Sequence, residues 1–554
     1  MDPAELSNSD RNEDFSSYAG RWIARSGNRV IAQGGTPEQA RRAAQASRPK
    51  EIPLVTYIPF PDPFVFHPLL SQVAAVLPEG EPAYLVGGAV RDAMLSRPTH
   101  DLDIVLPENA IQIARKVADS FNGFFYPLDI DRDYGRVVLP LSNSERFVID
   151  FTVYQGPDLE SDLRGRDFTV NAMAIDIHQP QTLFDPFGGV IDIHNKQIRI
   201  CQNDSLQKDP IRVIRGVRLA ASLNFQIHPD TRIQMRANAQ LLSNSTPERV
   251  RDEIVRILDG PKPASAFRAL DILGILAVIV PELVELKDIH QSPPHISDVW
   301  NHTLGVVKSL HLLIKVLSLD YNQDDAASLH LGLASTLLGR YREPLASHLS
   351  TLFTPDRSLR PLLYLAALYH DAGKPSTREM EPSGRIRFFE HEQASAEIVH
   401  RRAQALILSN PEVDYVTNIV RYHMRPLWMA QSKELPSRRA IYRFFRDTGP
   451  AGVDIALLSL ADTLATYGPS LPQELWVHQL EVIRVLFQAW WEHPQESVSP
   501  APLVTGHDLI DELDLSPGPI IGRILEEIRE AQATGLINDK EAALELARKI
   551  KSDG

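Results

Sequence analysis

The stretch YLVGGAVRDAMLSRPTHDLDIVLP, residues 84–107, constrains the fold of this chain more than any other feature. Residues 83–86 form a short apolar run that predicts a buried strand ending at Gly87-Gly88, and residues 89–95 have helical character. Paired glycines permit positive φ and leave no Cβ to obstruct a ligand. Because a helix N-terminus attracts phosphate, this strand–turn–helix unit predicts a phosphate-binding turn.

Two carboxylates follow the glycine turn. Asp101 and Asp103 alternate with Leu102 and Ile104, which predicts a strand that places both acids on one face. Neighbouring carboxylates repel each other unless a cation lies between them, and Mg²⁺ prefers carboxylates together with substrate phosphates. An exposed strand with two solvated acids is the alternative, but the nearby glycine turn favours phosphates with Mg²⁺.

A third acid, Asp150, lies inside the apolar run 146–153, where an unpartnered charge is costly. This run predicts a strand that pairs with residues 136–139 across a turn at 142–144. Three carboxylates around two metal ions form a two-metal site, in which one ion lowers the pKa of an attacking hydroxyl and the other holds the leaving pyrophosphate.

The ordered motifs resemble those of the bacterial tRNA nucleotidyltransferases and poly(A) polymerases, class II of the polymerase-β-like superfamily. The resemblance covers residues 62–551 and is carried by residues 87–92 (GGAVRD), 101–103 (DLD), 166–172 (RDFTVNA), 185–189 (DPFGG) and 209–212 (DPIR). It implies an α+β fold: a nucleotidyltransferase head with a mixed sheet and helices, then a mostly α-helical neck, an HD domain and a tail.

The resemblance also implies roles for individual residues. Asp101, Asp103 and Asp150 would be catalytic and hold Mg²⁺. The nucleotide-binding residues would be Gly87, Gly88 and Arg91 at the triphosphate, Arg166 and Asp167 at the ribose, and Asp209 and Arg212 at the base.

The expected base-reading pair has its own physical logic. We expect Asp209 and Arg212 to lie on one helical face because they are three residues apart. They offer an acceptor and a fork of donors, which suits the ring-nitrogen acceptor and amino donor of cytosine and adenine. Guanine and uracil present the reverse pattern and would leave unpaired groups. CTP and ATP are therefore the expected substrates, with tRNA as the acceptor and no nucleic-acid template.

Two departures from the family pattern bear on the product. Lys208 stands where the family usually has Glu, which affects how Arg212 is oriented. Only thirteen residues separate Asp150 from Arg164, where CCA-adding relatives carry a longer segment with a flexible loop; residues 152–155 also lack the family's usual Arg. In the family, a shortened loop accompanies enzymes that add only CC. We therefore expect CC addition, with full CCA addition as the alternative, and a separate A-adding enzyme acting on the same tRNA.

A second constellation lies in the C-terminal half, where the string LYHDAGKP ends an apolar helix. Its order and sequence resemble the HD phosphohydrolase superfamily. The resemblance implies a divalent metal, Mg²⁺, Mn²⁺, Ni²⁺ or Fe²⁺, whose bound hydroxide attacks a phosphate ester. The implied ligands are His302, His370, Asp371 and Asp462, with His391 and His423 matching the extra histidines of two-metal members.

Length and composition bound the remaining organisation. The 554 residues predict about three to five domains. The expectations are a disordered segment at 1–17, a ββαβ module of unknown function at 18–60, the head at 62–200, a base- and RNA-recognising neck at 201–265, a helical body with the HD domain at 266–475 and an RNA-binding tail at 476–554. The module should contain strands at 18–24, 29–33 and 53–58 and a helix at 36–46; helices are also expected at 209–225, 246–258 and 508–513.

Charge and cysteine content limit location and partners. No apolar run is long enough for a membrane helix, the polar N-terminus lacks a signal peptide's apolar segment, and the single Cys201 fits a reducing cytoplasm. The net charge of −14 argues against general nucleic-acid binding. Residues 196–256, however, carry eleven Lys/Arg and six Asp/Glu, a local +5 suited to an RNA backbone, although a helical surface of mixed charge is the alternative.

Three functions fit these features, and tRNA nucleotidyltransferase is favoured because every motif acid of the head is present. The first alternative is an HD phosphohydrolase acting on phosphate esters or RNA ends, with a head that mainly binds RNA. Poly(A) polymerase is weaker, because those enzymes usually carry a basic C-terminal region and this tail has none.

Overall fold

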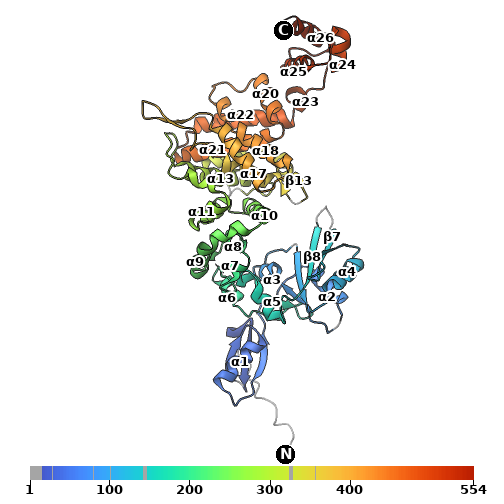
Figure 1. The fold of residues 1–554 in the computed structure, drawn as a ribbon, viewed down its shortest axis with the longest axis vertical. Helices are drawn as coiled ribbons and strands as arrows, with labels where there is room; N and C mark the ends of the chain where they lie inside the picture. Colours follow the sequence, from blue (N-terminus) through green and yellow to red (C-terminus); the bar gives the residue numbers. More distant parts are fainter. Residues whose placement is uncertain are drawn as a thin grey trace, which may run out of the picture. The chain divides into compact units, whose positions relative to one another are not determined.

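A computed structural model describes residues 15–27, 29–78, 80–99, 101–140, 146–322, 328–355 and 357–553 (Figure 1). The chain divides into two compact units, residues 1–241 and residues 242–554. The mixed α+β fold is the one expected: strands are concentrated in the first unit and helices in the second.

The N-terminal module has the predicted ββαβ order. It contains β1 (Arg21–Ser26), β2 (Arg29–Gly34), α1 (Pro37–Ser47) and β3 (Leu54–Ile58), with sheet order β2-β1-β3. Thr36 caps α1, since its hydroxyl accepts the amide of Gln39 at 3.2 Å. The first strand begins at Arg21 and not at Tyr18 as predicted, because residues 16–18 form a 3-10 helix. Most of the segment expected to be disordered, residues 1–14, lies outside the described residues.

The head is built on a seven-stranded mixed sheet in the order β10-β9-β4-β5-β8-β7-β6. The predicted strands are present, and β5 and β8 are its parallel neighbours. The turn expected at 142–144 lies outside the described residues. The strands are β4 (Tyr84–Val86), β5 (Asp101–Leu106), β6 (Phe124–Asp129), β7 (Tyr134–Pro140), β8 (Arg146–Val153), β9 (Ala174–Asp176) and β10 (Leu183–Phe184).

Helices surround this sheet and continue into the end of the first unit. They are α2 (Leu69–Val76), α3 (Gly88–Met94), α4 (Ala110–Ser120), α5 (Leu159–Gly165), α6 (Gly189–His194), α7 (Ser205–Lys208), α8 (Arg212–Leu223) and α9 (Pro229–Asn238). The helix predicted from residue 209 begins only at Arg212, because Asp209 is extended at φ −143° and ψ 92° and precedes a proline.

The second unit is mostly helical. The helix predicted at 246–258 is present as α10 (Pro247–Leu258), with Thr246 as its N-cap residue, although the Thr246 side chain makes no capping hydrogen bond. The helices that carry the HD motif are α13 (Val299–Val316), α16 (Leu359–Tyr369), α17 (His391–Ala405), α18 (Asn410–Tyr422) and α21 (Ala451–Tyr467). Two small hairpins interrupt the helices, β13 (Leu352–Thr354) with β14 (Arg357–Ser358), and β15 (Arg378–Met380) with β16 (Ile386–Phe388).

The tail contains α24 (Gly506–Leu513), α25 (Pro519–Ala533) and α26 (Lys540–Asp553), which share an apolar cluster of their own. Thr505 and Asp508 form a capping box at the start of α24. Across the described ranges, no helix combines the length and apolar character needed to cross a bilayer.

Candidate active site of the head and candidate metal centre of the HD domain

Two of the three predicted carboxylates meet across parallel strands. Asp103 on β5 and Asp150 on β8 are register partners, so their side chains project from the same face of the sheet. Burial raises the pKa of Asp103 to about 6; Arg166 partly offsets this effect, and Asp101 and Asp150 contribute to it. Asp101 lies two residues earlier on β5 and is more exposed. The strand alternation expected for Asp101 and Asp103 is therefore present, and the register of β5 with β8 brings Asp150 to Asp103.

Asp150 is held by two neighbours that the sequence did not single out. Arg136 on β7 donates two hydrogen bonds of 2.8 Å to its two carboxylate oxygens, and the hydroxyl of Tyr134 donates a third at 2.8 Å. Arg136 and Asp150 are register partners on antiparallel strands. The strand pairing predicted at 136–139 was a usable signal, because it brings residue 136 opposite residue 150.

The glycine turn lies directly beside these acids. Gly87 follows β4 at φ +76°, and a Cβ there would lie 2.9 Å from a carboxylate oxygen of Asp103 and 3.2 Å from the guanidinium of Arg166. Helix α3 starts at Gly88. Glycine suits both the positive φ and this close approach.

The expected nucleotide-binding arginines are fixed by carboxylates and amides. Arg166 bonds Asp162 at 3.2–3.3 Å. Arg91 bonds Asp92 at 2.8–2.9 Å and the side-chain oxygen of Asn171 at 2.6 Å. Arg91 does not line the cavity described below, but it contacts Asn171, which does.

Asp167 is buried and accepts hydrogen bonds from three neighbours. The donors are the amide of Phe168 at 2.8 Å, Asn171 at 3.1 Å and Arg215 at 3.4 Å. Asn171 and Arg215 were not predicted as site residues. Asn171 falls within the RDFTVNA motif. Arg215 follows Arg212 by three residues on α8, so spacing from Arg212 could have indicated it.

The expected base-reading pair is close in space, but not in the predicted way. Nε of Arg212 lies 3.7 Å from a carboxylate oxygen of Asp209, yet Asp209 precedes the helix. The terminal nitrogens of Arg212 donate to the hydroxyl of Ser205 at 2.7 Å and to the carbonyls of Gly165 and Arg166 at 2.8 and 3.2 Å. Its Nε is buried without a hydrogen bond.

Lys208 does not orient this pair. Its ammonium lies 2.8 Å from Asp204, four residues earlier, so the residue at the family's Glu position is engaged elsewhere.

These residues surround a cavity of about 460 Å³. It contains most of the predicted site but neither Asp101, Arg91 nor Asp209. Its lining comprises Gly87, Gly88, Asp103, Tyr134, Asp150, Thr152, Gln155, Asp162, Gly165, Arg166, Asp167, Asn171, Arg212 and Arg215.

The connection beside this cavity is short and tied at both ends. Five residues, 154–158, join β8 to α5. The amide of Tyr154 donates to the carbonyl of Leu106 at 3.0 Å, and the amide of Gln155 donates to Asp162 at 3.0 Å. Asp158 caps α5 by accepting the amide of Ser161 at 2.8 Å. This connection is therefore closely attached to the sheet and to α5.

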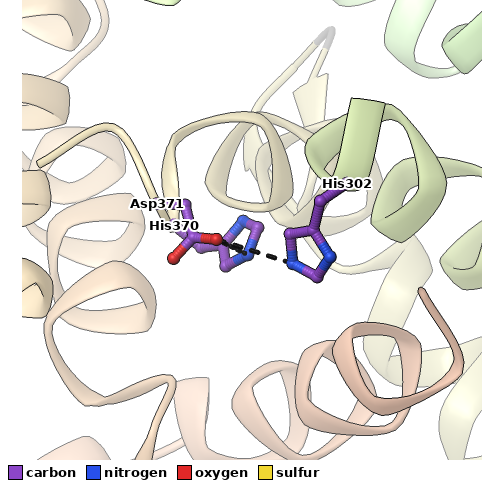
Figure 2. Close-up of side chains that lie close together, drawn as sticks. All are labelled: His302, His370 and Asp371. Atoms are coloured by element: carbon purple, nitrogen blue, oxygen red, sulfur yellow. Dashed lines mark ion pairs between the residues drawn. The ribbon is translucent and has the colours of Figure 1, made fainter. Parts of the chain in front are cut away.

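The HD residues converge from five helices or helix ends. Figure 2 shows His302 of α13 facing His370 and Asp371, which follow the last residue of α16. A carboxylate oxygen of Asp371 lies 3.5 Å from Nε2 of His302 and 3.2 Å from Nε2 of His370. The other oxygen lies 3.3 Å from Nε2 of His391, which begins α17. Asp462 of α21 lies 3.1 Å from His302.

The histidines direct Nε2 toward this centre. Nδ1 of His370, His391 and His423 each lies 2.7–3.1 Å from the carbonyl three residues earlier, which fixes Nδ1 as the donor. Nε2 of His302, His370, His391 and His423 is buried and makes no hydrogen bond to any described residue. Burial, with His370 and His391 nearby, lowers the pKa of His423 to about 3.

This arrangement fits a divalent metal. Two groups of possible ligands share Asp371: His302–His370–Asp371 and Asp371–His391–His423. Within each group, the ligand atoms lie within 4.8 Å of one another. Neutral imidazoles and a carboxylate are ligands of the transition metals and of Mg²⁺. Buried ring nitrogens without hydrogen bonds would be costly unless a cation used them. All six predicted residues are brought together.

A cavity of about 600 Å³ opens beside the centre and includes Asp371, His391 and Asp462. Lys374, which was not predicted as a site residue, also lines it and lies 2.7 Å from Asp371. It belongs to the HDAGK string, so the motif itself was the available signal.

The fold and the first site define a nucleotidyltransferase head, and the second site defines an HD domain. Family models match each part: the poly A polymerase head domain at residues 83–199, the probable RNA and SrmB-binding site of polymerase A at 224–286, the HD domain at 336–467, the putative tRNA nucleotidyltransferase domain 2 at 485–547, and a family of unknown function at 13–61.

Relatives extend the match over most of the chain. The CC-adding tRNA nucleotidyltransferase of Thermus thermophilus is 33% identical over 470 residues, covering 83% of this chain and 92% of the relative. The A-adding tRNA nucleotidyltransferase of Deinococcus radiodurans is 33% identical over 469 residues, covering 83% and 94%. The chain therefore belongs to the tRNA nucleotidyltransferase family.

Solved structures agree on the fold. A CCA-adding enzyme in complex with ATP is 20% identical, covers 87% of this chain and 94% of that structure, and gives a TM-score of 0.55. The Thermotoga maritima CCA-adding enzyme complexed with tRNA is 18% identical, covers 88% and 94%, and gives 0.51. At these identities the likeness supports the fold alone.

Proposed function

We propose that this enzyme adds C, and not the terminal A, to the 3′ end of tRNA from CTP with Mg²⁺. The family membership supports nucleotide addition to tRNA. It does not select the product, because relatives with equal identity are named CC-adding and A-adding. A separate enzyme would then add the terminal A, and tRNA as the substrate implies a cytoplasmic location.

In this proposal Asp101, Asp103 and Asp150 hold Mg²⁺, which when bound lowers the pKa of the tRNA 3′ hydroxyl and neutralises the leaving pyrophosphate. The fit rests on the paired carboxylates and on the raised pKa of Asp103, which shows how strongly a buried carboxylate there gains from a cation.

The chain's own residues bind and orient the nucleotide. The glycine turn supplies backbone amides to the triphosphate, and Arg166 and Asp167 contact the ribose. Asp209 and Arg212 face the base. Because the nitrogens of Arg212 already donate to Ser205 and to two carbonyls, the arginine is held in place before the nucleotide enters.

The observation that carries the choice of product is the five-residue connection 154–158. In the family, a flexible loop in this part of the chain accompanies the change from C to A addition. Here the connection is hydrogen-bonded to Leu106 and to Asp162 and includes the residue that caps α5, so no free segment remains that could move and reshape the nucleotide pocket. The pocket therefore keeps one shape after two cytidines have been added.

The test uses tRNA transcripts that end at the discriminator base, after one C and after two C, with CTP and ATP present together. We expect the first two to be extended to CC and the third to stay unextended, as read by sequencing the products. Conversion to a complete CCA end would contradict the proposal, and addition of A only to the third transcript would identify an A-adding enzyme.

A second activity is supported by the HD centre. We propose a metal-dependent phosphohydrolase that cleaves phosphate esters, because the buried Nε2 atoms form a site for a divalent metal next to a cavity lined by Lys374 and Arg387. A panel of phosphate mono- and diesters assayed with Mg²⁺, Mn²⁺, Ni²⁺ or Fe²⁺ tests it; the absence of hydrolysis with every metal would contradict it.

A further inference from the structure

The N-terminal module is the part of the first unit that no activity accounts for. Residues 15–60 contain seven Lys/Arg and two Asp/Glu, a net charge of +5 within a chain whose net charge is −14. In the part of the chain that the structure describes, Arg48 is the only one of the seven in an ion pair, with Glu51 at 2.8 Å. The module therefore presents an excess of positive charge.

The module is fixed to the head by specific contacts. The indole of Trp22 donates to the carbonyl of Leu183 at 3.0 Å, and its ring lies 5.7 Å from that of Phe184. The amide of Asp185 donates to the carbonyl of Gly35 at 2.8 Å, where a Cβ on Gly35 would overlap the backbone of Asp185. Gln39 donates to the carbonyl of Pro186 at 3.0 Å.

These contacts connect the module to the nucleotide site. They hold residues 183–186, which comprise the edge strand β10 and the first two residues of the DPFGG motif. Phe184 and Phe187 pack in the apolar cluster with Val86, which precedes the glycine turn, and with Tyr154 of the short connection. A ligand held by the module is therefore held in a fixed position relative to the head.

The exposed face of α1 carries two of the seven positive charges. Arg41 and Arg42 are exposed, whereas Ala40 and Ala44 are buried against the sheet of the module. Hydrogen bonds from Ser161, with smaller contributions from Arg164 and Arg42, lower the pKa of Asp158, so Arg42 lies near the start of α5. The other end of α5 carries Gly165, which lines the nucleotide cavity.

We propose that the module is an RNA-contacting surface, in which Arg41 and Arg42 of α1 bind phosphates of the tRNA whose 3′ end lies in the head. The occupant follows from charge complementarity to a polyanion and from the fixed position beside α5, and the inference rests on the proposed action on tRNA. Arginine suits phosphate because it donates two hydrogen bonds to it.

The test compares two matched double variants of the full chain. Arg41→Gln/Arg42→Gln removes two charges from α1; Arg115→Gln/Lys116→Gln removes two exposed charges from α4, a helix of the same length of 11 residues in the same unit. Glutamine keeps helix propensity, so both variants should fold. Binding of a labelled tRNA transcript without its CCA end is measured by fluorescence anisotropy at several KCl concentrations.

We expect the α1 variant to raise the Kd for tRNA about ten-fold near 0.1 M salt. The slope of log Kd against log salt concentration should fall by about 1 to 2, because each phosphate contact that is lost means about one fewer counterion released on binding. The α4 variant should leave both values unchanged. An unchanged Kd in the α1 variant, or an equal change in both variants, would overturn the inference.

The same proteins separate this inference from the proposed function. Residues 1–14 carry five acids and one Arg, so a chain starting at residue 15 is measured beside the full chain and should show the same difference between variants. A wild-type chain that binds tRNA but adds no nucleotide would overturn the proposed function alone. One that adds C while α1 substitution leaves tRNA binding unchanged would overturn the inference alone.

Discussion

The two candidate metal sites of this chain differ in how their ligand atoms are satisfied by the protein itself. In the head, Asp150 accepts three hydrogen bonds from Arg136 and Tyr134, and Asp162 is bonded to Arg166. In the HD centre, Nε2 of four histidines makes no hydrogen bond to a described residue. In the first site protein donors satisfy a ligand carboxylate. In the second, Lys374 pairs with Asp371, but three of the imidazole nitrogens lie beside carboxylates at 3.1–3.5 Å without a hydrogen bond.

This difference indicates how each metal is used. A carboxylate already paired with an arginine binds a cation only when substrate phosphates add further ligands, which is the usual behaviour of Mg²⁺. Buried imidazole nitrogens without partners are costly in the absence of a cation. We therefore interpret the head as a site whose metal enters with the nucleotide and the HD centre as a site with a resident metal.

The largest expected effect is on the head. Asp103→Ala or Asp101→Ala should reduce nucleotide addition below a few per cent of wild type, because each removes a carboxylate from the pair that would hold Mg²⁺. Asp131→Ala, an exposed acid in the turn between β6 and β7, is the matched control. A folded variant that retains more activity than this would contradict the assignment of these carboxylates as Mg²⁺ ligands.

The second prediction separates the two sites. His370→Ala should remove the resident metal, measured per chain by elemental analysis, and with it any phosphohydrolase activity. Nucleotide addition should stay within roughly two-fold, because independent sites behave additively. His507→Ala, an exposed histidine of the tail, controls for the loss of an imidazole. Loss of both activities in a folded variant would show that the sites are coupled.

The third prediction concerns stability. Removing metal with a chelator should lower the melting temperature of the unit that holds the HD domain by about 5 °C, since a metal present at 100 times its Kd stabilises by about 2.7 kcal/mol. The unit that holds the head should be unaffected until nucleotide is added. Equal shifts for the two units in calorimetry would contradict the comparison.

The sequence was sufficient for features that depend on local periodicity. The alternation of Asp101 and Asp103 predicted strand β5, and the apolar run 146–153 predicted β8. The string HDAGK predicted the end of an apolar helix, and His370 and Asp371 follow the last residue of α16. Here short-range pattern and long-range geometry agree.

The remainder depends on tertiary contacts. Arg136 reaches Asp150 through the register of two strands, which the expected pairing of residues 136–139 with 146–153 could have indicated. Asp209 was placed on a helix because three-residue spacing suggests one face, but Pro210 forces the residue before it into an extended conformation, so the helix starts at Arg212. The partners of Arg212, a serine and two carbonyls, are set by how α8 packs against α7 and the end of α5.

A smaller effect should follow from the pKa of Asp103, which is about 6. A proton and Mg²⁺ compete for this carboxylate, so nucleotide addition should fall about ten-fold per pH unit below 6 at low Mg²⁺ and be restored by more Mg²⁺. Because the folded pKa is raised, Asp103 favours the metal-free fold most below pH about 4, and this contribution is lost as the pH rises through 6. An acidic limb that Mg²⁺ does not move would contradict the assignment.

The smallest expected effect tests the basis of the comparison, the partial neutralisation of Asp150 by Arg136. Arg136→Gln removes a positive charge that competes with Mg²⁺ for this carboxylate. Because the arginine side chain is 39% exposed, the competition is screened and is worth about 0.7 kcal/mol. The Mg²⁺ concentration for half-maximal nucleotide addition should therefore fall about three-fold. Arg132→Gln, which removes an arginine that is 79% exposed in the turn before β7, should leave it unchanged. If Arg136→Gln instead raises the Mg²⁺ requirement, the arginine orients Asp150 for the metal, and the head, like the HD centre, is a site built around its cation.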